Sequence, residues 1–259
     1  MRGPLAGATA LCLLALSSIK PAQGQGTTFD GSLSYAARDE VTDQDNPDQS
    51  LDNDIFRVTG AVTWDVGDGR MRAALEAGVR NEDFSGDAPL LGGAELDFAR
   101  RVGDKRYALY GRLRGDEDLS VTTELGYGLQ HLGTRVDLRG LVGFQLVADA
   151  SKVRGRSAAS AFGLGEATYY VTPNWAVSVG LQGDIDGAVW AGSTEYRPRR
   201  WGGLSMFVAY AEAFDKYRDV VSYDTLSAGF RWVPGAGNSL RAQRQFNLGV
   251  VTQRFVEVQ

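Results

Sequence analysis

The stretch LSVTTELGYGLQHLGTRVDLRGLVGFQ, residues 119–145, decides the fold of this chain, because apolar and polar side chains alternate along two segments of strand length. Side chains of a β-strand point alternately to opposite faces of the sheet, so each segment has one apolar and one polar face. In the first segment Leu125 and Tyr127 share the apolar face, and Glu124 lies on the polar one. A tight connection at Leu132-Gly133 leads into a second segment with the same alternation. The stretch therefore predicts two successive strands, each apolar on one face.

The same pattern recurs along the rest of the chain and predicts about twelve strands, with roughly 10 to 14 compatible with the spacing. Tight turns such as Gly67-Asp68-Gly69-Arg70 alternate with longer polar connections such as Ala148–Ser157. Short turns at one end and long loops at the other are typical of bacterial outer-membrane barrels, while a soluble β-sandwich with uneven loops is the alternative. The predicted strands lie near residues 28–38, 54–66, 71–81, 91–102, 106–115, 119–131, 134–147, 158–171, 175–185, 188–197, 201–212 and 222–232.

The aromatic residues favour the membrane alternative. Four of the five tryptophans fall near the turn-side ends of predicted strands. Tryptophan and tyrosine prefer the boundary between hydrocarbon and headgroups, so such a ring marks a membrane surface. The predicted fold class is therefore all-β, a single transmembrane, antiparallel, up-and-down β-barrel with apolar faces toward lipid and charged faces toward the lumen. The expected aromatic girdle consists of Trp64, Tyr107, Trp175, Trp201 and Trp232.

The chain divides into three predicted parts. Residues 1–24 combine a basic start, a short apolar run and small residues at the end, which is the pattern of a cleaved signal peptide. Residues 25–232 form the barrel. Residues 233–259 form a C-terminal tail that reads as extended over 240–258, and it is interpreted as a periplasmic extension, a plug or extra strands. The only cysteine, Cys12, lies in the leader, so the mature chain has no disulfide.

This combination of leader, strand rhythm, loop asymmetry and aromatic girdle resembles the Gram-negative outer-membrane β-barrel proteins of the small-porin class. The resemblance covers residues 1–232 and is one of architecture, because no specific family motif is present. It implies location in the bacterial outer membrane, an even number of strands and passive transport. The partners that it implies are outer-membrane lipid, lipopolysaccharide, the outer-membrane assembly machinery and small solutes. Such barrels often end on an aromatic residue, whereas this chain ends in Gln259.

Charged residues on the polar faces form the predicted lumen lining. Tight turns of four residues would set Asp97 against Arg112, Glu95 against Arg114 and Asp65 against Arg72, and opposite charges across a strand pair stabilise such a register. Either these ion pairs fill a narrow barrel, or the arginines attract anions into a water-filled pore whose carboxylates tune selectivity. The lining residues are Arg57, Asp65, Arg72, Glu76, Arg80, Glu95, Asp97, Arg112, Arg114, Glu124, Asp137 and Arg139.

Three functions fit these observations. The first is a narrow passive channel for small solutes, anions among them. The second is a non-conducting structural or surface-loop binding barrel with a salt-bridged lumen, and the third is a soluble periplasmic or secreted β-protein. Enzymatic activity is not expected, because the single histidine, His131, lies at a turn-side strand end and no catalytic, cofactor or metal-ligand motif is present. The net charge of −5 at pH 7 argues against nucleic acid as a partner.

Overall fold

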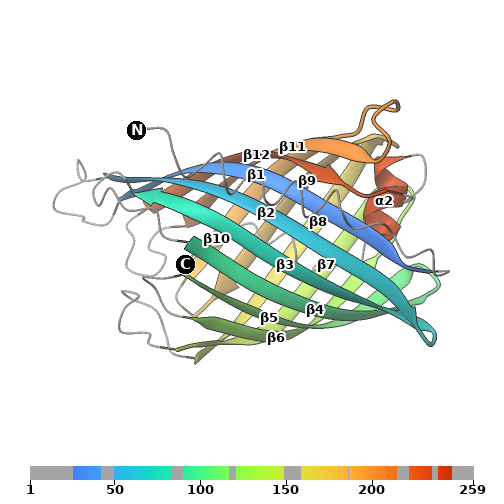
Figure 1. Cartoon of the computed structure of the whole chain (residues 1–259), viewed down its shortest axis with the longest axis horizontal. Helices are drawn as coiled ribbons and strands as arrows, with labels where there is room; N and C mark the ends of the chain where they lie inside the picture. Colours follow the sequence, from blue (N-terminus) through green and yellow to red (C-terminus); the bar gives the residue numbers. More distant parts are fainter. Residues whose placement is uncertain are drawn as a thin grey trace.

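The protein folds as a closed barrel of twelve antiparallel strands, in which each strand pairs with its neighbours in chain order and β1 pairs with β12 (Figure 1). The structure is a computed structural model that describes residues 26–41, 50–82, 90–116, 121–148, 159–185, 187–214, 222–234 and 239–246. The predicted all-β, up-and-down barrel is thus confirmed. The predicted signal peptide, residues 1–24, lies outside the described residues.

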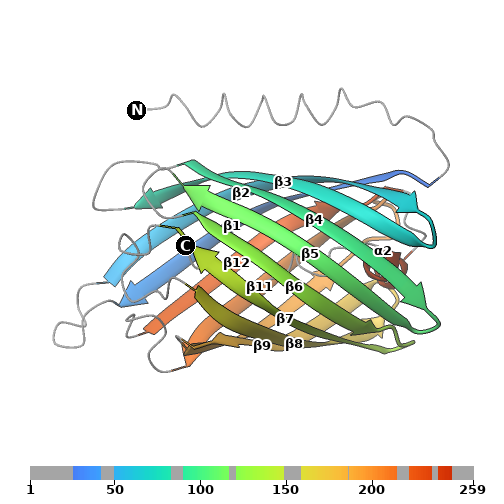
Figure 2. The same ribbon diagram turned by 90° about the horizontal axis from the view of Figure 1, so that it is seen from below.

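The strands are close to the predicted ones. They are β1 (Thr28–Val41), β2 (Ser50–Val66), β3 (Gly69–Glu82), β4 (Leu90–Val102), β5 (Lys105–Asp116), β6 (Thr122–His131), β7 (Val136–Val147), β8 (Ala159–Thr172), β9 (Trp175–Asp184), β10 (Gly187–Tyr196), β11 (Leu204–Phe214) and β12 (Ser222–Trp232). A helix, α2 (Leu240–Phe246), lies at the turn-side end of the barrel (Figures 1 and 2). Among the described residues no helix is both long and apolar enough to cross a membrane.

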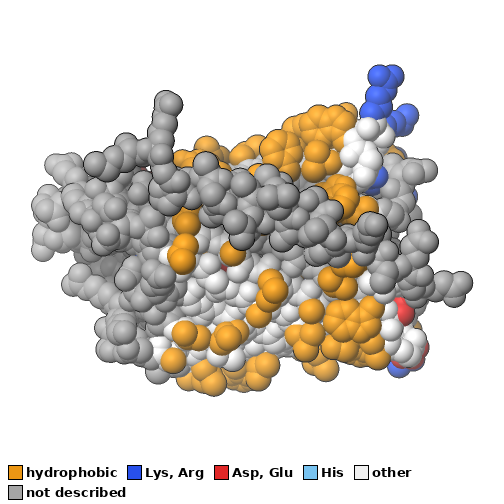
Figure 3. All heavy atoms as spheres, in the orientation of Figure 1, with side chains coloured by type: hydrophobic (Ala, Val, Ile, Leu, Met, Phe, Trp, Pro, Cys, Tyr) orange, Lys and Arg blue, Asp and Glu red, His pale blue; other side chains and the backbone are white. Residues whose placement is uncertain are grey.

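The alternating pattern places apolar side chains on the outside of the barrel. Leu75 and Phe144 are each 70% exposed and Leu125 is 63% exposed, which is the reverse of the arrangement in a soluble core. Their charged strand neighbours face inward, and Asp97 is fully buried. Hydrophobic side chains accordingly appear on the outer surface of the strands in Figure 3. An apolar exterior around a charged interior is the pattern of a barrel surrounded by lipid.

The predicted register at two turns is wrong by two residues. Val66 pairs with Gly69 and Val102 pairs with Lys105, so each connection contains two residues rather than four. Gly67 and Gly103 adopt φ values of 60° and 62°, which glycine tolerates and which two-residue hairpins require. The structure therefore sets Asp97 against Tyr110, Glu95 against Arg112 and Asp65 against Arg70, in place of the predicted Arg112, Arg114 and Arg72.

The described part of the tail is also a correction, because residues 240–246 are helical where the sequence reads as extended. The segment LRAQRQF contains mostly residues with high helix propensity. The Ser239 hydroxyl accepts a hydrogen bond of 3.2 Å from the backbone N–H of Ala242, which caps the first turn. This short helix packs against β9.

Candidate functional site

The interior wall formed by β2, β3, β4 and β5 carries three arginines around one carboxylate. Glu76 lies 3.1 Å from Arg57, 2.6 Å from Arg114 and 3.8 Å from Arg112, measured between nitrogen and oxygen. All four side chains come from inward-facing positions, so the alternation that exposes the apolar residues also gathers these charges. Arginine suits this arrangement because its planar group keeps its charge and can engage two acceptors at once.

A second cluster lies nearer to the turn-side end and is centred on Arg72. Its guanidinium group is 2.9 Å from Glu95, 3.0 Å from Asp30 and 3.6 Å from Asp97. Arg112 joins the two clusters, because its Nε lies 3.7 Å from Glu95. The result is a continuous row of alternating charges along one side of the interior.

The opposite side of the interior holds a third group of charges. Arg139 on β7 lies 2.8 Å from Glu166 on β8. Glu195 on β10 lies 2.9 Å from Arg231 on β12 and accepts a hydrogen bond of 2.6 Å from the Ser205 hydroxyl. These contacts join residues of different strands. Opposite charges therefore face each other on this side of the interior as well.

Helix α2 lies inside the turn-side end and contacts this third group. The Arg244 side chain donates a hydrogen bond of 3.2 Å to the Ser178 hydroxyl, and its Nε lies 3.5 Å from Glu195. Burial lowers the pKa of Arg244, but the carboxylates of Glu195 and Glu166 raise it by more, so the net shift is upward from the ordinary value. Arg244 is therefore a permanent cation held against the inner wall.

The last turn of α2 contacts the neighbouring strands. The Gln245 side-chain amide donates hydrogen bonds of 3.1 Å to Asp137 and 2.9 Å to the Gly133 carbonyl. Asp137 also accepts a hydrogen bond of 2.6 Å from the Tyr170 hydroxyl. Arg106 donates to the Gln245 carbonyl. The helix is thus connected to residues of β5, β7, β8, β9 and β10.

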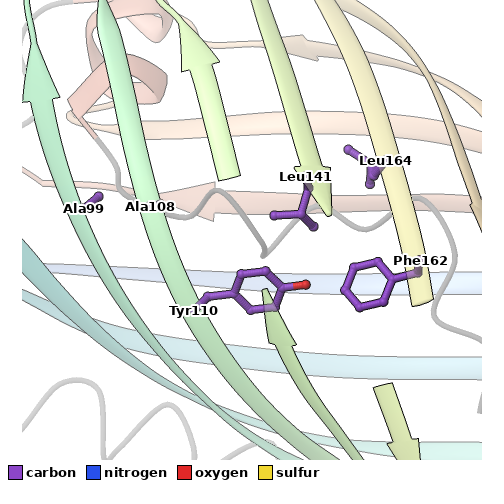
Figure 4. Packing of buried hydrophobic residues seen from close by; sticks show 6 residues of the cluster. All are labelled: Ala99, Ala108, Tyr110, Leu141, Phe162 and Leu164. Carbon is purple, nitrogen blue, oxygen red and sulfur yellow. The ribbon is translucent and has the colours of Figure 1, made fainter. Parts of the chain in front are cut away.

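One part of the interior is apolar (Figure 4). Tyr110, Gly126, Gly143 and Phe162 pair in register as one row across β5, β6, β7 and β8. A Cβ at Gly126 would meet the Tyr110 ring at 2.5 Å, and one at Gly143 would meet the Phe162 ring at 2.7 Å. The two rings therefore lie over the two glycines, with centroids 6.5 Å apart. Glycine is required at both positions because any side chain would occupy the space of a ring.

The predicted lining residues occupy the interior with one exception. Asp65 is a correction: it lies at the turn-side rim, its side chain is 53% exposed, and it pairs with Arg70 at 2.9 Å. Arg57 and Glu76 are half-buried on the inner face. The remaining predicted lining residues are buried: Arg72, Arg80, Glu95, Asp97, Arg112, Arg114, Glu124, Asp137 and Arg139.

Sequence reasoning missed several interior residues. Asp30, Glu195, Arg231 and Arg244 take part in the ion pairs but are absent from the predicted lining. The signal for the first three was present, because each alternates with an outward apolar residue along its strand. The position of Arg244 depends on docking of α2, which no local pattern indicates.

The predicted girdle residues all lie toward the turn-side end. Trp175, Trp201 and Trp232 are 41–44% exposed, and Trp64 and Tyr107 are half-buried. The Trp175 indole N–H donates a hydrogen bond of 2.8 Å to the Thr194 hydroxyl, which satisfies its polar edge. His131 lies on the outer surface at the same end, 3.1 Å from Asp104. Within the described ranges no group of three or more His, Cys, Asp or Glu side chains is arranged to hold a metal ion.

Solved structures share this fold at low sequence identity. An outer-membrane channel from Pseudomonas putida F1 is similar with a TM-score of 0.65 at 10% identity, over 83% of this chain and 100% of that one. The NanC porin is similar with a TM-score of 0.55 at 11% identity, over 78% and 98% of the two chains. The translocator domain of the autotransporter NalP from Neisseria meningitidis has a TM-score of 0.50 at 13% identity, over 88% and 95%.

No family model and no curated protein matches the chain. The structural likeness shows the fold of Gram-negative outer-membrane β-barrels, as the sequence pattern predicted. The neighbours include a channel, a porin and a translocator domain, so the fold alone does not distinguish among their functions.

Proposed function

We propose that this protein is a narrow passive channel for small solutes in the bacterial outer membrane. The observation that carries the proposal is the closed barrel with exposed apolar side chains outside and buried charged side chains inside. Lipid surrounds such a barrel, and polar solutes and water interact with its interior. Its partners are then outer-membrane lipid and lipopolysaccharide around the wall, the assembly machinery during insertion, and the solutes themselves.

Anions are the favoured solutes, because positive charge is locally in excess on one inner wall. Three guanidinium groups, from Arg57, Arg112 and Arg114, lie within 4 Å of the Glu76 carboxylate. Arg112 also lies 3.7 Å from Glu95, so these contacts set three arginines against two carboxylates. Cationic side chains on the wall of a narrow polar passage lower the energy of a passing anion and raise that of a cation. The carboxylates on the same wall limit the affinity, so that a bound anion can leave again.

Planar-bilayer recording of the refolded full-length protein tests this function. We expect discrete current steps, and a reversal potential in a KCl gradient that indicates a preference for chloride. Arg114→Gln should shift that reversal potential toward cation preference. The matched control is Arg100→Gln, which removes an arginine from the exterior, where it is 57% exposed and pairs with Asp68 at 2.6 Å. Well-folded protein that never conducts would contradict the channel.

A non-conducting barrel is the second candidate, and a specific observation favours it. Ion pairs connect neighbouring strands on two sides of the described interior, and α2 occupies the turn-side end. A barrel filled in this way would carry no current and would act through its surface loops. The same recordings distinguish the two candidates, because only a channel gives current steps that change with Arg114.

A further inference from the structure

We propose that α2 is a positively charged gate of the turn-side mouth, closed by one ion pair and a set of hydrogen bonds and opened by membrane potential. The inference rests on the proposed channel function and adds a mechanism by which the passage is regulated. It follows from three features of α2: where it lies, what holds it there, and the charge that it carries.

The first feature is position. Leu240 is fully buried and Gln243 is 1% exposed, so one face of α2 is buried against the barrel, while the other described side chains of the helix are partly exposed. Its polar contacts go to inward-facing side chains of β7, β9 and β10, namely Asp137, Ser178 and Glu195. A helix with its side chains is about 10–12 Å across, so a helix in this place narrows any passage through that end.

The second feature is that the contacts holding α2 are mainly polar. Within the described residues, the buried apolar contact of α2 is the cluster of Leu240 with Tyr170 and Ala176. Its other contacts with described residues include hydrogen bonds, such as the one from the Leu240 N–H to Asn174, and the ion pair between Arg244 and Glu195 at 3.5 Å. Water can replace polar contacts when the helix moves outward, so release costs far less than removal of an apolar core. A helix of seven residues is also marginal by itself, so it can unwind as it leaves.

Glu195 is central among the polar contacts that hold α2. Its carboxylate lies between Arg244 of α2 and Arg231 of β12, at 3.5 and 2.9 Å. Without that negative charge the two guanidinium groups would face each other across a buried space and repel. Neutralising Glu195 should therefore weaken the hold on Arg244 and shift α2 toward the released state, although the hydrogen bonds of α2 to Asn174 and Asp137 remain.

The third feature is charge. The helix sequence LRAQRQF contains Arg241 and Arg244 and no acidic residue. Each elementary charge that crosses the full membrane field changes the ratio of two states by roughly 50-fold per 100 mV. A potential that is negative on the turn side pulls the helix out of the mouth, and the opposite potential holds it in. The steepness of the response measures the charge that moves.

Single-channel recording with channels inserted in one orientation tests the gate. We expect the wild-type protein to open more often when the turn side is negative than when it is positive. Glu195→Gln should raise the open-to-closed ratio at 0 mV by roughly tenfold or more, as expected when a charge-assisted contact is lost. The matched control is Asp65→Asn, which removes a carboxylate from the same rim where it pairs with Arg70, and its ratio should equal that of the wild type.

Arg241→Gln tests the charge of the helix through the voltage dependence of opening, which would not change if Arg241 only supported the structure. It removes one of the two helix charges, so the dependence of the open-to-closed ratio on voltage should become about half as steep. A disulfide between α2 and the barrel tests the same movement directly. We place it with the double substitution Asn174→Cys and Leu240→Cys, because the Asn174 side chain accepts a hydrogen bond of 3.2 Å from the Leu240 N–H. Oxidation, verified by gel mobility, should abolish opening at every voltage, and reduction should restore it.

The outcomes separate the gate from the channel. The gate is overturned if the current is equal at both polarities and unchanged by Glu195→Gln. It is also overturned if the current persists in the oxidised cysteine pair. Either outcome leaves the proposed channel intact. Absence of current in the wild type, in Glu195→Gln and in the reduced cysteine pair overturns the channel itself.

Discussion

Replacing Arg72 by methionine tests whether the interior ion pairs stabilise the barrel. The Arg72 side chain is 1% exposed and lies 2.9 Å from Glu95, 3.0 Å from Asp30 and 3.6 Å from Asp97. Methionine retains much of the volume but leaves three carboxylates near one another without their shared cation. Removing one partner of a buried ion pair costs about 3–5 kcal/mol, because the remaining charge is buried without compensation. We expect a loss of that size in the free energy of unfolding at neutral pH.

Urea-induced unfolding in lipid vesicles, followed by tryptophan fluorescence, measures this loss. Arg70→Met is the matched control, because Arg70 pairs at 2.9 Å with a carboxylate of Asp65 that is 53% exposed. Exposed pairs contribute about 0–1 kcal/mol. An equal cost for the two substitutions at neutral pH would refute the reasoning.

Two other substitutions test the packing and the outward face. Gly126→Ala should destabilise the barrel by about 1–3 kcal/mol, because the added Cβ would meet the Tyr110 ring at 2.5 Å. Gly140→Ala is the control, because no atom lies within 4 Å of the position of its Cβ. Its free energy of unfolding in the same urea titration should be close to that of the wild type. Leu125 is 63% exposed and is expected to face the middle of the bilayer, so Leu125→Arg should lower the free energy of unfolding in vesicles by about 2–4 kcal/mol. Asp68→Arg, in a turn, should have little effect on the same quantity. A neutral Leu125→Arg would contradict the lipid-facing assignment.

Much of the fold follows from local alternation along the chain. The period of two in residues 119–145 identifies the strands and also which side chains face outward, because one face of each strand is continuous. Leu125 and Leu138 are 63% and 50% exposed, while Glu124 and Asp137 beside them are buried. This signal is repeated in most strands, so its reversal in part of β8, where Phe162 and Leu164 are buried, does not change the architecture.

Register and the tail were not predictable in the same way. The pairing of β2 with β3 depends on whether Gly67 takes a left-handed conformation in a two-residue turn, and a difference of two residues preserves every inward and outward face. Hydrophobic patterning therefore cannot detect the error. The helix at 240–246 is stabilised by contacts with residues such as Asn174 and Asp137, which lie about 66 and 108 positions earlier in the sequence, a separation beyond any local pattern.

The seam between β1 and β12 has a consequence for how the chain can vary. Gly31 pairs with Trp232, so the first strand begins and the last strand ends on the same rim. Both ends of the strand series lie at one rim because the number of strands is even. At the opposite rim Val41 pairs with Ser50, so residues inserted between these two would leave the ladder of β1 and β2 in place. The sequence and length of the connections at that rim can therefore vary while the barrel keeps its fold, whereas the rim that carries α2 is constrained by the contacts of the helix.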